Sequence, residues 1–83
     1  MQDFIKKRAE RNYNEIMSII SKCKTKTELI NNVRQEEVII DEFQDTVNIY
    51  KDELKIVIKT DKKISVKRVL VFDENYEDYV DLF

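Results

Sequence analysis

The chain has 83 residues, enough for one domain over residues 1–83 that buries only about 60% of the surface of its unfolded chain. Hydrophobic residues make up 42% and charged residues 39%, with a formal net charge of −2, a composition that excludes a disordered chain and a membrane span. Histidine and glycine are absent, which removes the commonest general base, most zinc sites and glycine-rich phosphate loops.

Two helices are predicted in the first part of the chain. Apolar residues at helical spacing predict a first helix over residues 3–23. Thr25 followed by Glu28 is typical of a capping box, in which the two side chains satisfy free N–H groups at a helix start. The sequence therefore predicts a second helix over residues 25–36.

The middle of the chain predicts an antiparallel meander of three or four strands. Residues 38–43 contain three consecutive β-branched residues, which favour a short strand over an extension of the second helix. Both assignments remain open at this point. From Val47 to Phe72 the hydrophobic period is two, with polar breaks at YKDEL and KTDKKI.

The segment DENYEDYVDLF predicts a C-terminal helix packed on the same sheet. Asp73 can cap this helix, and Tyr76, Tyr79, Val80 and Phe83 follow at positions i, i+3, i+4 and i+7. The expected fold class is therefore α+β, with helices covering one face of an antiparallel sheet. In the absence of glycine, we expect Asn and Asp to provide the turn residues with positive φ.

The sequence contains no targeting or membrane signal. No apolar run reaches the roughly 20 residues that cross a bilayer, and MQDFIKKRAERN lacks the apolar centre of a signal peptide. Cys23 is the one cysteine of the sequence, so no internal disulfide is possible. We expect a cytoplasmic protein without a membrane partner.

Acidic residues are concentrated in two segments, which predict a protein-binding surface. A local acidic field attracts a basic partner even when the net charge is small. A solvated surface without a partner is the alternative, and the sequence leaves open whether the charged segments form separate patches. The predicted protein-binding residues are Glu36, Glu37, Asp41, Glu42, Asp45, Glu74, Glu77, Asp78 and Asp81.

No catalytic set rises above chance in this sequence, so we expect a binding protein rather than an enzyme, without a cofactor or a metal. Its size and composition resemble those of small proteins that phages and mobile elements direct against host machinery, anti-CRISPR proteins among them. That resemblance implies an accessory or inhibitory protein whose partner is another protein with a basic surface. The sequence does not predict the oligomeric state.

Nucleic-acid binding through the first helix is the main alternative, because phosphate contacts require basic side chains. The negative net charge argues against it, as does the lack of aromatic residues alternating with the strand lysines. The candidate residues are Lys6, Lys7, Arg8 and Arg11 on the first helix, with Lys55, Lys59 and Lys67 on the strands.

The final residues YVDLF resemble the pentapeptide with which bacterial polymerases and repair proteins hold the DNA sliding clamp. Asp81, Leu82 and Phe83 match it, whereas Tyr79 and Val80 replace the usual glutamine and leucine. The resemblance implies an extended tail that inserts into the clamp. A packed helix instead buries Phe83 and leaves Leu82 at the margin of the apolar stripe.

One set of residues resembles a metal-dependent nuclease. Asp45 followed by Glu53 and Lys55 matches an arrangement in which two carboxylates hold a divalent cation and a lysine assists the attacking water. Two acid-x-Lys triplets occur in the sequence, as many as its composition gives by chance. We therefore predict no catalytic site.

Overall fold

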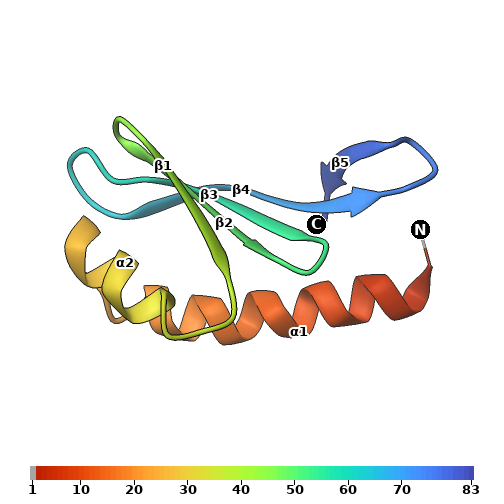
Figure 1. The fold of residues 1–83 in the computed structure, drawn as a ribbon, viewed down its shortest axis with the longest axis horizontal. Helices are drawn as coiled ribbons and strands as arrows, with labels where there is room; N and C mark the ends of the chain where they lie inside the picture. The colour runs from red at the N-terminus through yellow and green to blue at the C-terminus, as the bar shows by residue number, and fades with distance from the viewer. Residues whose placement is uncertain (1) are drawn as a thin grey trace.

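The computed structural model describes residues 2–83 and contains two helices followed by five strands (Figure 1). The α+β class is thereby confirmed. The helices are α1 (Asp3–Ile20) and α2 (Lys26–Val33). The strands are β1 (Ile39–Phe43), β2 (Thr46–Lys51), β3 (Leu54–Lys59), β4 (Ser65–Asp73) and β5 (Asp78–Asp81).

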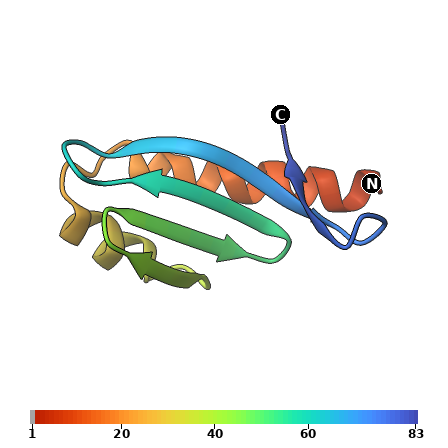
Figure 2. The same ribbon diagram turned by 90° about the horizontal axis from the view of Figure 1, so that it is seen from above.

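The five strands form one antiparallel sheet in which each strand pairs with the next one along the chain. The long helix α1 runs beneath this sheet, and α2 lies beside the C-terminal half of α1 (Figures 1 and 2). Figure 2 views the sheet with both helices behind it, so one face of the sheet is covered and the other is open. None of the described helices is long and apolar enough to cross a membrane.

The core lies between the covered face of the sheet and the two helices. Alternate residues of each strand point to the same face, so the period of two in the sequence supplies one apolar face per strand. Burying these side chains is the main stabilising contribution of the fold. The core consists of Ala9, Ile16, Ile20, Cys23, Leu29, Val33, Val47, Ile49, Leu54, Ile56, Ile58, Val71 and Leu82.

Half of the capping box predicted at the start of the second helix is present, since the Glu28 carboxylate accepts from the Thr25 hydroxyl at 3.3 Å and not from the Thr25 backbone N–H. The Thr25 hydroxyl accepts a hydrogen bond from the Glu28 backbone N–H at 3.1 Å, which fixes the first turn of α2. Both helices end about three residues earlier than expected, at Ile20 and Val33. Residues 38–43, which were ambiguous between helix and strand, contain β1.

The prediction of a C-terminal helix is wrong, and so is the count of three or four strands. Residues 78–81 form β5, which pairs with β4 through Phe72 opposite Tyr79 and Asp73 opposite Asp78. The Asp73 carboxylate accepts a hydrogen bond from the Asn75 N–H at 2.9 Å. This local bond is common to helix N-caps and to turns, and here it closes a turn.

Three turn residues have positive φ, and each lies in a hairpin connection. They are Gln44 (φ 51°), Asp52 (φ 52°) and Glu77 (φ 51°). The expectation that Asn and Asp would supply these positions is therefore right only for Asp52. For residues with a Cβ the left-handed conformation costs roughly 1–2 kcal/mol, so Gln44 and Glu77 carry backbone strain that glycine would avoid.

Candidate protein-binding surface

The open face of the sheet carries a group of aromatic residues. Tyr50 on β2 lies opposite Lys55 on β3, and Lys55 lies opposite Leu70 on β4. Phe72, two residues beyond Leu70, lies opposite Tyr79 on β5. Because residues i and i+2 of a strand share a face, all five side chains belong to the face that the helices leave uncovered.

The aromatic side chains hold Lys55 between them. The Lys55 ammonium lies 5.4 Å from the ring centroid of Tyr50 and 5.2 Å from that of Tyr79, a distance typical of cation–π interactions. The Tyr79 ring packs edge-on against Phe72, with centroids 5.5 Å apart. We call Tyr50, Lys55, Leu70, Phe72 and Tyr79 the aromatic patch.

Leu70 forms a small second core at the centre of the aromatic patch. Its side chain is only 5% exposed, although it lies on the open face and outside the cluster beneath the sheet. No helix covers it, so side chains of the open face must exclude water from it. The patch is therefore an ordered surface rather than a set of independent exposed rings.

The connection between β4 and β5 continues the aromatic patch with acidic residues. It begins directly after the Phe72–Tyr79 and Asp73–Asp78 pairs, and the Tyr76 N–H donates to the Asp73 carbonyl at 3.2 Å. At its tip the Tyr76 side chain is 74% exposed. We call residues 74–78, with the sequence ENYED, the acidic turn.

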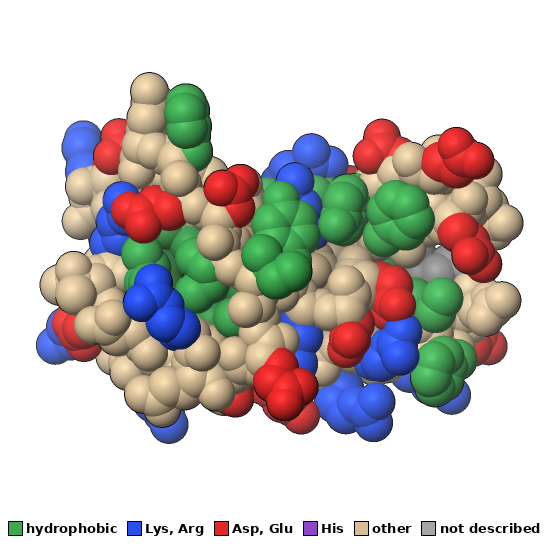
Figure 3. All heavy atoms as spheres, in the orientation of Figure 1, with side chains coloured by type: hydrophobic (Ala, Val, Ile, Leu, Met, Phe, Trp, Pro, Cys, Tyr) green, Lys and Arg blue, Asp and Glu red, His purple; other side chains and the backbone are tan. Residues whose placement is uncertain are grey.

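The acidic turn and hydrophobic side chains lie next to each other on the molecular surface. Figure 3 shows acidic side chains over the β4–β5 connection at the upper right, and hydrophobic side chains directly beside them. Residues 73–83 contain five acidic and no basic side chains. Among residues 2–83, no recorded ion pair involves Glu74, Glu77 or Asp78.

The structure separates the two groups of predicted acidic residues. Those in residues 36–45 lie before, on and directly after β1, at one edge of the sheet, and those in residues 74–81 lie on and before β5, at the other edge. Two of the nine are in ion pairs, Glu42 with Lys26 and Asp81 with Arg68 at 3.2 Å. The nine side chains therefore do not form one continuous surface.

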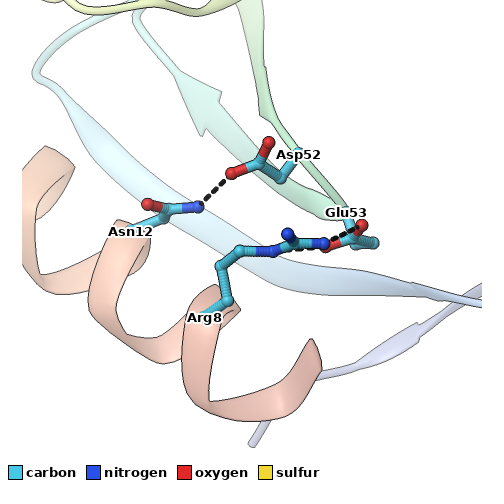
Figure 4. A network of polar contacts seen from close by, with 4 residues as sticks. All are labelled: Arg8, Asn12, Asp52 and Glu53. Atoms are coloured by element: carbon cyan, nitrogen blue, oxygen red, sulfur yellow. Dashed lines mark hydrogen bonds and ion pairs between the residues drawn. The ribbon is translucent and has the colours of Figure 1, made fainter. Parts of the chain in front are cut away.

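The basic residues of the first helix do not act as one group, because Arg8 is bound within the fold. Its Nε donates to Glu53 Oε1 at 3.1 Å and its Nη2 donates to the same oxygen at 2.6 Å (Figure 4). The hydrogen bond to Glu53 raises the pKa of Arg8. Lys6, Lys7 and Arg11 are exposed on α1.

A second polar contact lies beside this pair. The Asn12 side-chain amide donates to Asp52 Oδ2 at 2.9 Å, so two consecutive residues of the β2–β3 connection hold α1 (Figure 4). Asn12 is buried, and this bond satisfies a polar group that would otherwise be costly to bury. The basic strand residues also differ: Lys55 is held in the aromatic patch, whereas Lys59 and Lys67 are exposed.

The residues that resemble the clamp-binding pentapeptide are extended, but one of them is part of the core. Leu82 is 6% exposed, and its N–H donates to the Val69 carbonyl at 3.0 Å. Phe83 is 74% exposed, with its ring centroid 5.0 Å from that of Tyr13. The predicted exposure of these two residues is therefore reversed: Leu82 is buried and Phe83 is on the surface.

The residues that resemble a nuclease are not brought together. Asp45 precedes β2 and Glu53 follows it, and a strand of six residues spans about 20 Å. Glu53 is bound to Arg8, and Lys55 lies between two tyrosine rings. Within the described residues no group of His, Cys, Asp and Glu side chains is placed to hold a metal ion.

The aromatic patch was not predicted from the sequence. The helical spacing of residues 76–83 assigned Tyr79 to a core-facing helix, which separated it from Tyr50 and Phe72. Reading Tyr79 and Asp81 as one side of a strand, with Val80 and Leu82 on the other, was the signal that could have located it. Comparisons of the chain with protein-family models, curated proteins and solved structures found no match.

Proposed function

We propose that this chain is a protein-binding accessory or inhibitory protein, and not an enzyme, which binds a basic partner protein through the aromatic patch and the acidic turn. The observation that carries the proposal is the position of the patch: ordered aromatic side chains lie on the sheet face that no helix covers, next to an acidic turn with an exposed tyrosine. Of the two groups of predicted acidic residues, we therefore propose that the group next to β5 binds the partner and that the group next to β1 does not.

The composition of the patch supports protein binding. Centres of protein interfaces are enriched in tyrosine and phenylalanine and poor in acidic residues, while their rims are polar. Tyr50, Phe72 and Tyr79 fit this composition, whereas Lys55 does not, because lysine is also depleted in interfaces; the acidic turn would form the rim. Because the rings are already packed around Leu70 and Lys55, they would lose little conformational freedom when a partner binds.

The charge of the acidic turn supports a basic partner. Among the described residues Glu74, Glu77 and Asp78 form no ion pair, and the Asp78 carboxylate accepts one hydrogen bond, from the Tyr79 N–H at 2.7 Å. Uncompensated charges at the edge of an interface mainly increase the rate of association, and salt screens this effect. Binding should therefore weaken as the ionic strength rises.

Site-specific photo-crosslinking tests the proposal. The variant Tyr76→p-benzoylphenylalanine places a photoreactive group on the acidic turn, and Phe43→p-benzoylphenylalanine places the same group at a similarly exposed aromatic site on β1. Each N-terminally tagged variant is irradiated in a nuclease-treated bacterial lysate. We expect one protein crosslinked from position 76 and absent from position 43.

Charge reversal then tests the surface. Glu74→Lys with Glu77→Lys should abolish the crosslink, whereas Glu37→Lys with Asp41→Lys at the other edge should leave it intact. Loss of the crosslink in Glu37→Lys with Asp41→Lys, but not in Glu74→Lys with Glu77→Lys, would contradict the proposal and assign binding to the β1 edge. Retention of nucleic acid without nuclease, with no protein crosslinked after nuclease, would contradict the proposal and favour nucleic-acid binding.

A further inference from the structure

Part of strand β4 has a free edge. β4 pairs with β3 from Ser65 onward, but its pairing with β5 begins only at Leu70, opposite Asp81. One further hydrogen bond joins the Leu82 N–H to the Val69 carbonyl. Within residues 2–83, the segment 65–68 thus has a neighbouring strand on one side only. Figure 2 shows that the chain beyond β5 runs away from β4 and does not continue along its edge.

A groove of about 400 Å³ follows this free edge. Its apolar part is formed by Val66, Val69 and Phe83, and its charged part by Lys67, Arg68 and Asp81. The register between β3 and β4 shifts here, because Val66 is opposite Ile58 while Arg68 is opposite Val57. Lys67 is the extra residue of this bulge, and its side chain is exposed at the groove.

We propose that the groove binds an extended acidic peptide segment, which adds to β4 as a further strand. An unpaired strand edge offers backbone donors and acceptors to an incoming strand, whose main-chain hydrogen bonds provide affinity while side-chain contacts provide specificity. Val66, Val69 and Phe83 would contact alternate apolar side chains of the peptide. This surface is separate from the aromatic patch and the acidic turn.

Charge complementarity selects an acidic peptide. Arg68 already binds Asp81 at 3.2 Å, whereas no recorded ion pair within residues 2–83 involves Lys67. The β3–β4 connection at the start of β4 adds Lys62 and Lys63 against one acid, Asp61. Carboxylates of a strand lying along residues 65–68 would therefore meet mainly positive charge.

A peptide titration followed by NMR tests the inference. The probe is an end-capped octapeptide of alternating valine and glutamate, and the first control is the same peptide with lysine in place of glutamate. A second control carries N-methyl groups at alternate backbone amides, which removes one row of hydrogen-bond donors without changing the charge. We expect shifts of the amide signals of Ser65 to Arg68 with the acidic probe alone.

Matched protein variants separate the groove from general charge. Lys67→Glu should weaken binding of the acidic peptide about tenfold, the loss of roughly one charge-assisted contact. Lys22→Glu, an equal charge change at an exposed site outside the groove, should leave binding unchanged. Equal weakening by both variants, or equal binding of the N-methylated peptide, would overturn the inference.

Two other occupants would also overturn it. Tighter binding of a dT10 oligonucleotide, with shifts at the same amides, would identify a phosphate-binding surface. Self-association of the protein would appear as sedimentation that depends on its concentration. If Lys67→Glu and Asp41→Lys each abolish this self-association, β1 of a second copy occupies the edge.

Discussion

The guanidinium of Arg8 and the carboxylate of Glu53 join α1 to the β2–β3 connection across 45 positions of the sequence, with both side chains about a quarter exposed. Two guanidinium nitrogens bind the carboxylate, which gives the contact a fixed direction as well as attraction. We expect Arg8→Gln and Glu53→Gln each to lower the urea midpoint of unfolding.

A double-mutant cycle measures this pair. The effect of Arg8→Gln with Glu53→Gln should be clearly smaller than the sum of the single effects, because each single change already breaks the pair. Arg8→Lys should recover only part of the loss, since lysine lacks the planar two-nitrogen geometry. Lys7→Gln, at the exposed neighbouring position, is the control, and additive single effects would contradict the contact.

The pH dependence of the pair follows from the raised pKa of Arg8. A group whose pKa is higher in the folded protein binds its proton more tightly there, so its contribution is fully present below the pKa of the unfolded chain. It is lost only as the pH rises through the raised value. From pH 7 to pH 10 the titration of Arg8 should therefore cause no loss of stability. Urea unfolding should give the same difference in the free energy of unfolding between the parent and Arg8→Gln at both pH values.

Leu82 and Phe83 should differ sharply in their contribution to stability. Leu82→Ala removes a side chain buried in the core and should lower the free energy of unfolding by about 2–5 kcal/mol. Phe83→Ala removes an exposed ring and should cost less than about 1 kcal/mol. Urea denaturation followed by circular dichroism distinguishes the two, and equal effects would contradict the burial of Leu82.

Glycine should stabilise the β1–β2 connection. Gln44 has a φ of 51°, and Gln44→Gly should raise the free energy of unfolding by about 0.5–1 kcal/mol, because the relief of the left-handed conformation exceeds the entropy that glycine adds to the unfolded chain. Asp45→Gly, one residue later and without a positive φ, should not stabilise. Thermal unfolding of both variants gives the comparison.

Asp52 should respond differently to the same substitution. Its φ is also positive, but its carboxylate accepts the hydrogen bond of buried Asn12. Asp52→Gly relieves the backbone and leaves that amide without its acceptor, which costs about 1–3 kcal/mol. We therefore expect no gain, or a net loss of stability, in the thermal unfolding of Asp52→Gly. A gain equal to that of Gln44→Gly would contradict the role of the Asn12 contact.

The aromatic patch can be tested through Leu70. Leu70→Ala should lower the free energy of unfolding by about 2 kcal/mol, near the lower end for buried leucines, because the open face can relax into the space. It should also change the tyrosine fluorescence, since Tyr50 and Tyr79 flank the same patch. Val57→Ala, a half-buried residue of the neighbouring strand, should have the smaller effect on both measurements.

Most of the fold was predictable because its signals are local. The capping box of Thr25 and Glu28 located α2, and the period of two located β2, β3 and β4. The C-terminal element was not predictable, because the apolar residues of positions 76–83 fit both the helical period and the strand period of two. Val80 and Leu82 fit a strand as well as Tyr76, Tyr79 and Val80 fit a helix, and only pairing with β4 distinguishes the two.

The candidate surface was less predictable than the fold. Its acidic turn follows from composition, but the aromatic patch depends on strand register, which places residues 29 positions apart, Tyr50 and Tyr79, around one lysine. A linear search for aromatics alternating with lysines cannot find such a set. The contact of Arg8 with Glu53 escaped prediction for the same reason, since nothing in either segment identifies the other.

The neighbour-to-neighbour order of the sheet has a consequence for how the chain reaches its fold. Each strand pairs with the strand just before it, so each hairpin closes a short loop, and the entropy lost at each step is small. The sequence contains no proline, which removes the slow isomerisation phase that delays many chains. The sheet can therefore form by successive additions, and the contacts most distant in the sequence form when α1 packs against it, with Arg8 and Asn12 bound to the β2–β3 connection.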